Sequence, residues 1–94
     1  MILECIYDSR QSFYGKAMVN CYETDEVVHK ELISYDTMVA NYVRYKNENK
    51  EVFEYFGKYS QTTSRHQKEF FRQLGLTEKE IKELYKNERL ERAW

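Results

Sequence analysis

The sequence has no proline, three glycines and two cysteines among its 94 residues. No stretch has the Pro-, Gly- or Ser-rich composition of a linker, so we expect residues 1–94 to form a single domain. Two cysteines are too few for the disulfide framework that small secreted domains usually carry. The chain also lacks an apolar run near the roughly 20 residues of a membrane-spanning helix. These absences predict a soluble, cytoplasmic protein that does not contact membranes.

An excess of charge of one sign is missing as well. The chain has 15 Lys and Arg against 16 Asp and Glu, so its formal net charge is -1. This balance excludes binding of nucleic acid by bulk charge, and any such contact needs a local basic patch. What the chain does have is aromatic side chains, which make up 16% of it and include 9 tyrosines. With 41% hydrophobic residues in total, it can build a small core, which excludes global disorder.

The first half of the chain has the composition of β-strands. β-Branched and aromatic residues recur in short runs that polar loops interrupt, and part of the sequence alternates between apolar and polar residues. The last two runs flank a polar loop and predict an antiparallel hairpin. The expected strands, about four in number, cover residues 2–7, 16–22, 32–45 with a turn or bulge at 36–37, and 52–56.

The second half changes to a helical period. Phe70 and Leu74 lie four positions apart, a run of Ser and Thr that favours an N-cap precedes them, and Gly75 follows as a stop. Thr77 and Glu80 then have the spacing of a capping box, which opens a second helix. The expected helices cover about residues 62–74 and 78–92. Strands followed by helices indicate an α+β fold, with two C-terminal helices packed on a small antiparallel sheet.

Cysteine and histidine provide four side chains of the types that bind zinc, namely Cys5, Cys21, His29 and His66. The paired short spacings of a structural zinc site are absent, so the site would have to be assembled from four separate elements. The favoured interpretation is that the cysteines are small buried side chains and that His66 is hydrogen-bonded near a helix start. We therefore expect no metal and no cofactor.

A basic patch is predicted on the first helix. Between residues 57 and 73 four cations stand against one acid, Glu69, and most of them share the helix face opposite Phe70. Two nearby tyrosines are placed to stack on bases. The residues of this predicted interaction surface are Lys58, Arg65, Lys68 and Arg72, with Tyr55 and Tyr59. The alternative is a solvated helix face on which Glu69 pairs with Arg65 and Arg72.

Two further segments bear on partners. On a helix through residue 92, Leu90 and Trp94 fall on the side opposite the apolar stripe of Ile81 and Leu84. They predict a small exposed apolar patch for a partner or for a second copy of the chain, the alternative being a frayed end. The acidic residues at 23–26 predict a solvated loop, with mimicry of phosphate charge toward a nucleic-acid-binding partner as the alternative.

Sequence signatures of enzymes are missing from the chain. It has no phosphate-cradling glycine loop, no nucleophile elbow, no His-Glu-x-x-His and no paired-cysteine motif. A chain of this length also has little room for a pocket that excludes water. We therefore expect a protein that is not an enzyme.

Three strings occur in a fixed order: SRQSFYGKA at residues 9–17, SYDTMVA at 34–40, and YSQTTSRHQKEF at 59–70 with RQLG at 72–75. Together they resemble a small domain, without an assigned activity, that is common in phages, plasmids and other mobile elements of Gram-positive bacteria. Phe71 stands where that pattern has an aliphatic residue. The resemblance implies an accessory protein of mobile DNA in the cytoplasm of a bacterial host, in a group of which some members act against host defences.

These observations give one main hypothesis and two alternatives. The main hypothesis is a non-enzymatic accessory protein that binds a host protein or ribonucleoprotein effector, with an anti-CRISPR-type inhibitor as its sharpest form. The first alternative is a nucleic-acid-binding accessory domain that uses the basic helix face. The second is a metal-binding protein with Cys and His ligands.

Overall fold

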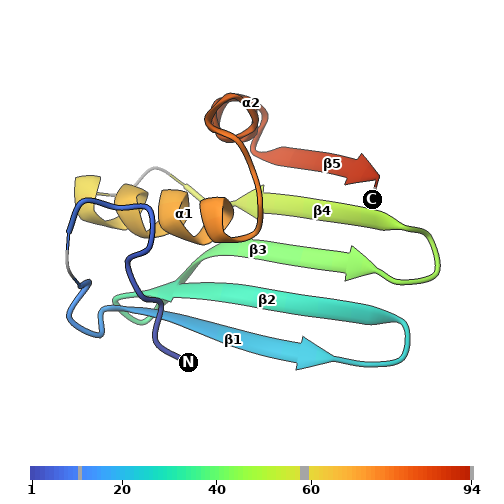
Figure 1. Ribbon diagram of the computed structural model, residues 1–94, viewed down its shortest axis with the longest axis horizontal. Helices are drawn as coiled ribbons and strands as arrows, with labels where there is room; N and C mark the ends of the chain where they lie inside the picture. Colours follow the sequence, from blue (N-terminus) through green and yellow to red (C-terminus); the bar gives the residue numbers. More distant parts are fainter. Residues whose placement is uncertain (11, 58–59, 94) are drawn as a thin grey trace.

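A computed structural model describes residues 1–10, 12–57 and 60–93. Its centre is an antiparallel sheet of strand order β1-β2-β3-β4-β5, and two helices are inserted between the last two strands (Figure 1). The elements are β1 (Ala17–Glu23), β2 (Val27–Ser34), β3 (Thr37–Tyr45), β4 (Lys50–Tyr55), α1 (Gln61–Gln73), α2 (Glu78–Asn87) and β5 (Arg89–Ala93). Among the described residues, no helix is long and apolar enough to cross a membrane.

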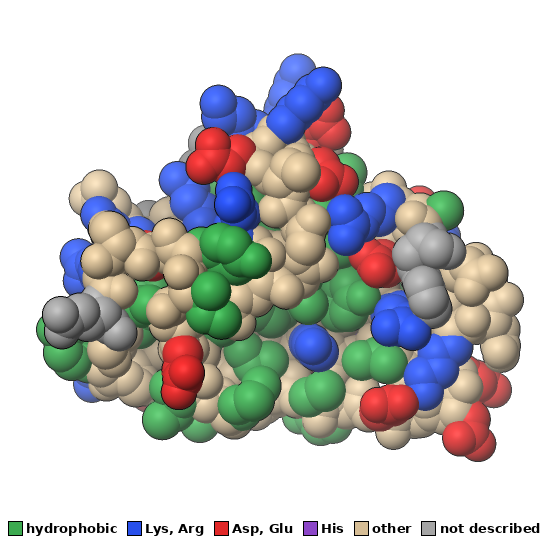
Figure 2. Space-filling model, in the orientation of Figure 1, with side chains coloured by type: hydrophobic (Ala, Val, Ile, Leu, Met, Phe, Trp, Pro, Cys, Tyr) green, Lys and Arg blue, Asp and Glu red, His purple; other side chains and the backbone are tan. Residues whose placement is uncertain are grey.

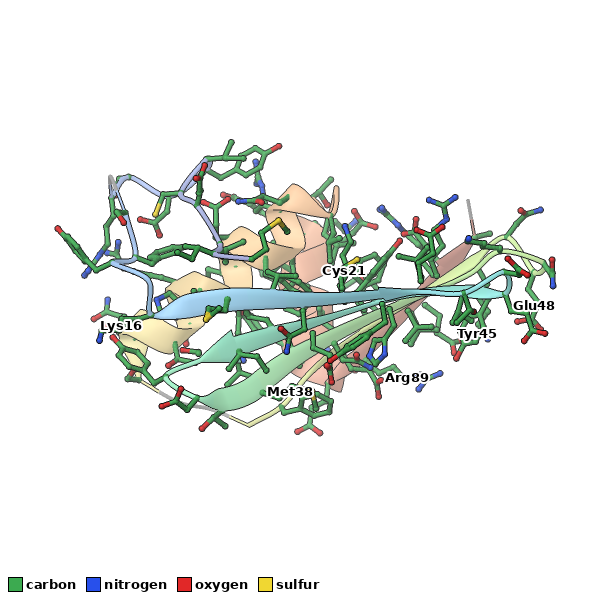
Figure 3. All side chains as sticks on the ribbon, turned by 90° about the horizontal axis from the view of Figure 1, so that it is seen from below. Lys16, Cys21, Met38, Tyr45, Glu48 and Arg89 are labelled. Carbon is green, nitrogen blue, oxygen red and sulfur yellow. The ribbon has the colours of Figure 1, made fainter. Side chains whose placement is uncertain are left out.

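The molecule has two layers, because both helices lie on the same face of the sheet (Figure 1). α1 packs on β2 and β3, while α2 packs on β4 and β5. The N-terminal segment crosses the outer side of α1, and Leu3 from this segment is buried. Seen along the edge of the sheet, Cys21 lies on the side of the helices, whereas Met38, Tyr45 and Arg89 lie on the opposite side (Figure 3). In the part of the chain that the structure describes, no helix covers this opposite face of the sheet.

The core lies between the sheet and the helices, and the strand register explains which residues form it. Alternate residues of a strand point to one face, so the cross-strand neighbours Tyr42, Phe53 and Leu90 all face the helices. At the bulge opposite Leu32 and Ile33, β3 has one extra residue, and both Val39 and Ala40 are buried there. The helices contribute large side chains that are at most 4% exposed, namely Phe70, Phe71, Ile81 and Leu84. Burial of these apolar surfaces is the main source of stability.

The predicted α+β fold is confirmed, and the helix starts follow the expected capping chemistry. Ser60 caps α1, because its hydroxyl accepts a hydrogen bond from the backbone N–H of Thr63. Thr77 and Glu80 form the predicted capping box at the start of α2, with hydrogen bonds of 3.2 and 3.0 Å. Gly75, with φ of 94°, adopts the left-handed conformation that the connection between the helices requires.

The sheet has five strands rather than about four, and the prediction of a strand at residues 2–7 is wrong. Only Ile2 pairs with β1, through an isolated bridge to Met18. The backbone N–H of Leu3 still donates to the carbonyl of Ala17, but the N–H groups of residues 6–8 bind the side chain of Glu69 on α1 instead of a strand. An apolar composition alone does not show whether a segment's backbone partner is a strand or a side chain.

The run at residues 32–45 is two strands rather than one. Tyr35 and Asp36 have φ of 49° and 69°, as in a two-residue type I′ hairpin turn, and they separate β2 from β3. The turn predicted at residues 36–37 thus lies one residue earlier, since Thr37 already belongs to β3, and it joins two strands. β2 begins at Val27, directly after the acidic loop. The sequence Tyr-Asp is unusual at this turn, where Asn-Gly is preferred, and this explains why the hairpin was missed.

The second helix ends at Asn87 instead of continuing to about residue 92. Glu88 has φ of 64°, a left-handed conformation that terminates the helix, and residues 89–93 form β5 on the free edge of β4. The helical stripe fails at Leu90 for this reason: its side chain lies opposite Phe53 within the sheet.

Candidate functional site

The four metal-ligand candidates do not meet. Cys21 and His29 lie on opposite faces of the sheet, because Tyr22, the neighbour of Cys21, is the direct partner of His29. Cys5 lies in the N-terminal segment, where burial raises the pKa of its thiol. His66 is fully buried on α1. Within the described residues, no group of three or more His, Cys, Asp or Glu side chains could hold a metal ion.

The most ordered polar site is a buried cluster of Ser34, Thr63 and His66, which we call the polar cluster. The hydroxyl oxygen of Ser34 lies 2.8 Å from Nδ1 of His66 and 3.1 Å from the hydroxyl oxygen of Thr63. All three side chains are at most 5% exposed. The end of β2 supplies Ser34, and the first turns of α1 supply the other two. Hydrogen bonding therefore fixes the start of α1 on the sheet.

Aromatic rings surround the imidazole of this cluster. The ring of Phe13 meets His66 edge-on at 4.5 Å between centroids, and Tyr35 stacks on it at 5.8 Å. Nε2 of His66 has no hydrogen-bond partner among the described residues. Burial lowers the pKa of His66, the Arg10 charge lowers it further, and Asp8 acts in the opposite direction. The neutral imidazole is the form that this site favours.

The three strings that carry the family resemblance converge on the polar cluster. The first string contributes Phe13, the second contributes Ser34 and Tyr35, and the third contributes Thr63 and His66. The first two strings also form adjacent tight turns, joined by a hydrogen bond of 3.0 Å from the backbone N–H at position 35 to the carbonyl at position 16. Sequence spacing alone could not reveal this convergence, because it depends on the sheet register.

A pair of Ser and His side chains also occurs in nucleophilic catalysis, in which a base activates a hydroxyl that attacks the substrate. Here Ser34 is 2% exposed and His66 is 0% exposed, beneath aromatic rings. A substrate would need to displace those rings in order to reach the hydroxyl. The geometry favours a role for the cluster in holding α1 on the sheet.

The predicted basic patch is smaller than expected. Arg65 forms an ion pair with Asp8 at 3.3 Å. Arg72 lies 3.7 Å from Glu78 of α2 and 4.9 Å from the centre of the Tyr7 ring. Lys68 is exposed. Two members of the predicted surface, Lys58 and Tyr59, lie outside the described residues.

The sequence predicted that Tyr55 belongs to an exposed stacking surface, and this prediction is wrong. Its side chain is 5% exposed, and its hydroxyl donates a hydrogen bond of 2.8 Å to the backbone carbonyl of Tyr85. Leu90 is likewise packed against the core rather than exposed, because it belongs to β5 and not to a helix. The other half of that predicted patch, Trp94, lies outside the described residues.

Glu69 has a role that the sequence analysis missed. Its side chain is 2% exposed, and Oε1 accepts hydrogen bonds from three consecutive backbone N–H groups, those of Ile6, Tyr7 and Asp8, at 2.8 to 3.1 Å. Oε2 accepts a hydrogen bond from Gln73 at 2.7 Å. The expected surface ion pairs of Glu69 with arginines are therefore wrong. The one feature of the sequence that could have indicated the burial of Glu69 is its position beside Phe70, on the buried side of the helix.

The second candidate site is the uncovered face of the sheet, which we call the open face. By strand alternation and register, it carries Met18, Asn20 and Tyr22 of β1; Val27, His29, Glu31 and Ile33 of β2; Met38, Asn41, Val43 and Tyr45 of β3; Lys50, Val52 and Glu54 of β4; and Arg89, Glu91 and Ala93 of β5. Tyr22, Met18 and Met38 remain 54%, 42% and 39% exposed. Large apolar side chains exposed together often mark an interaction surface.

The open face is organised in rows that cross the strands. One row at the end of the two tight turns is entirely apolar and consists of Met18, Ile33 and Met38. The next row is polar and runs across all five strands through Asn20, Glu31, Asn41, Glu54 and Arg89. Within it, the amide of Asn41 donates to Glu54 at 3.2 Å, and Arg89 pairs with Glu54 at 3.6 Å.

Residues 1–88 match the model of a family of unknown function, DUF8033. The chain belongs to this family. The match covers the polar cluster, four of the five strands and both helices, and it ends just before β5. Comparison with curated proteins and with solved structures finds no match.

Proposed function

We propose that this member of DUF8033 acts by binding rather than by catalysis, and that it docks on a partner protein through the open face. The carrying observation is the row formed by Met18, Ile33 and Met38, apolar side chains that lie side by side on a face without helices. Methionine suits such a surface, because its flexible side chain adapts to the shape of a partner.

The charges around the open face indicate the chemistry of the partner. The exposed loops at its rim carry Asp25, Glu26, Asp36 and Glu48, and none of these has an ion-pair partner among the described residues. Acidic side chains lie at the β1–β2 hairpin end of the molecule, with Lys and Arg side chains beside them (Figure 2). Charge complementarity therefore favours a partner that has an apolar centre and a basic rim. Proteins that bind nucleic acid present such basic surfaces.

The sharpest form of the proposal is an accessory protein of mobile DNA that occupies the basic surface of a host protein or ribonucleoprotein, as an anti-CRISPR-type inhibitor does. The resemblance of the three strings to domains of phages and plasmids supports this form, and so does the acidic rim. Both the mobile-element setting and the bacterial cytoplasm belong to this proposal.

The experiment compares three versions of the chain as bait in a bacterial lysate. The variant Met18→Lys/Met38→Lys adds two positive charges to the open face, whereas Glu83→Lys makes the same change in net charge on the exposed side of α2. We expect the wild type and Glu83→Lys to retain the same partner, which then forms a stoichiometric complex from purified components. The open-face variant should lose it. Equal retention by all three versions, or no complex, would contradict the proposal.

Two additional measurements test the charge argument and the anti-defence role. Replacement of Asp25 by Asn and Glu26 by Gln should weaken the complex at low salt and have little effect at high salt, because salt screens exposed charges. Expression of the wild type should protect a phage or plasmid from the host's defence, and Met18→Lys/Met38→Lys should abolish the protection. Protection that is absent, or that survives this variant, would remove the anti-defence role.

The second candidate function is binding of a nucleic-acid backbone by the basic face of α1. Fewer unpaired cations are present for this binding than the sequence indicated, because Arg65 forms an ion pair with Asp8. Lys68 and Arg72 still face the same side of the molecule, which favours contact with an anion. Binding of DNA or RNA that falls steeply with salt, and that an Arg65→Glu/Arg72→Glu variant loses, would support it. No binding at about 50 mM salt would exclude it.

A further inference from the structure

The helix side of the molecule contains a cleft that the docking proposal does not use. It lies between Tyr7 and Asp8 of the N-terminal segment, α1 and α2, and has a volume of ≈ 420 Å³. This volume falls in the range of small-molecule sites. Figure 2 views the molecule from this side and shows Lys and Arg side chains gathered over the two helices.

Three cations from two helices line the cleft. Lys68 and Arg72 lie one helical turn apart on α1, and Lys82 faces them from α2. Within the described part of the chain, Lys68 and Lys82 have no ion-pair partner. The partner of Arg72 is Glu78, whose side chain is 84% exposed, so this pair is solvated and weak.

Two of the carboxylates that line the cleft, Glu69 and Asp8, are already engaged. Glu69 accepts three backbone N–H groups and the amide of Gln73. Asp8 pairs with Arg65 and accepts the backbone N–H of Arg10. Glu69 and Asp8 therefore already have partners, and among the described residues Lys68 and Lys82 have no ion-pair partner and can meet an anion from solution.

The cleft also has an aromatic wall. The ring of Tyr7 lies beneath the guanidinium of Arg72, at 4.9 Å from the ring centre. Ile81 and Tyr85 complete an apolar floor. The phenol of Tyr85 is neutral at physiological pH, as that of an ordinary tyrosine is, and burial raises its pKa further.

A cavity with cations at its mouth and rings in its wall fits an anion that carries a flat aromatic group. We propose that the cleft binds a nucleoside monophosphate, with the phosphate between Lys68, Arg72 and Lys82 and the base against the ring of Tyr7. The ligand is either a free nucleotide or the 5′-phosphorylated end of a strand, since both present the same chemistry. This site lies on the face opposite the open face, so it is independent of the docking proposal, whereas it shares Lys68 and Arg72 with the second candidate function.

A phosphotyrosine peptide has a related head group but fits less well. A peptide that binds in an extended form needs backbone hydrogen bonds beside its pocket, as a sheet edge provides. The walls of this cleft are two helices and the segment at residues 6–8, whose backbone N–H groups are bound to Glu69.

The test is calorimetric titration of the full chain with AMP, adenosine, inorganic phosphate and O-phosphotyrosine. We expect AMP to bind, adenosine and phosphate to bind at least about tenfold more weakly, and added salt to weaken the AMP complex. A 5′-phosphorylated trinucleotide that binds more tightly than AMP would identify a strand end as the source, and weaker binding would identify the free nucleotide.

Matched variants locate the site. Arg72→Ala and Lys82→Ala should each weaken AMP binding at least about tenfold, because each removes a charged contact to phosphate. Tyr7→Ala should weaken AMP but leave inorganic phosphate unchanged. Lys79→Ala and Lys86→Ala remove exposed lysines of α2 that do not line the cleft, and they should have no effect. Absence of AMP binding at about 5 mM, equal loss in the control variants, or tighter binding of O-phosphotyrosine than of AMP would overturn the proposal.

Discussion

The two faces of the sheet differ in how their polar and apolar side chains are used. On the helix face, buried polar groups such as Gln67, which donates to the carbonyl of Val39 at 2.9 Å, have assigned partners that hold the layers in position. On the open face, Met18 and Tyr22 are exposed although they are large and apolar. The first face is therefore explained by folding alone. The second carries surface that folding does not require, and such surface is where a binding function is expected.

The largest expected effect comes from a comparison of two adjacent residues of β2 that point to opposite faces of the sheet. Leu32 is fully buried against the helices, whereas Ile33 lies half-buried on the open face. We expect Leu32→Ala to lower the free energy of unfolding by about 3 kcal/mol and Ile33→Ala by less than about 1 kcal/mol. Urea unfolding followed by circular dichroism measures both. Similar losses would show that the open face is covered in solution.

The second-largest loss of stability is expected from a change in the polar network on the helix face. Glu69→Ala leaves three backbone N–H groups of the N-terminal segment without their acceptor, which should cost about 2 kcal/mol in the free energy of unfolding. Glu83→Ala, on the exposed side of α2, is the control and should cost less than about 0.5 kcal/mol. Faster amide exchange at residues 6–8 in the first variant alone would confirm the mechanism. Equal stability of the two variants would contradict it.

The buried imidazole predicts a dependence of stability on pH. Since folding lowers the pKa of His66, the unfolded chain binds a proton first as the pH falls below about 6.5. Stability should be full above that pH and decline below it, by at most about 1.4 kcal/mol per pH unit, because one proton is involved. Ser34 is hydrogen-bonded to the imidazole and Tyr35 stacks on it, and the charges that act on it are those of Asp8 and Arg10. The measurement is the free energy of unfolding between pH 4.5 and 8.

The variant His66→Asn isolates this contribution, because its amide replaces Nδ1 and does not titrate. It should flatten the decline, whereas His29→Asn, on the open face, should leave it intact. Below about pH 4.5 further stability is lost as carboxylates are protonated, since hydrogen bonds and cations hold the pKa of Glu80 and Glu91 below their usual value. If the free energy of unfolding of His66→Asn still declines between pH 6.5 and 4.5, the decline belongs to another group.

The smallest effect concerns the two tight turns at the end of the sheet. Tyr14 and Tyr35 both have positive φ, at 54° and 49°, where asparagine is preferred. Tyr14 is 81% exposed, so Tyr14→Asn should stabilise the fold by about 0.5 kcal/mol. Tyr35→Asn should bring no gain, because it removes the ring that stacks on His66. Thermal unfolding compares the two, and a gain from both would show that this ring contact contributes little.

Local signals in the sequence predicted much of the fold. The capping box of Thr77 and Glu80, the i, i+4 pair of Phe70 and Leu74, and the composition of the first half suffice for an α+β arrangement. What could not be predicted depends on partners distant in the chain. Residues 89–93 form a strand only because β4 offers a free edge, and the sole local hint was that Leu90 departs from the helical stripe.

The candidate sites were harder to predict for the same reason. The sequence placed Arg65, Lys68 and Arg72 on one face of a helix, but the acid that pairs with Arg65 is Asp8, which is distant from it in the chain. The open face is invisible locally, because alternation shows that β3 has two faces and not which one the helices cover. The composition did indicate a high content of aromatic side chains, and one of these, Tyr22, lies on the open face.

The late position of β5 in the chain has a consequence for how the molecule opens. β1 to β4 are joined by short hairpins, whereas β5 can pair with β4 only after both helices are in place, so it closes a long loop. We expect its amides to exchange with solvent before those of the hairpins. Each such opening frees the edge of β4, and at high concentration the β5 of a second molecule can take the vacant place. The connection at Glu88 would then act as the hinge of a strand-swapped pair.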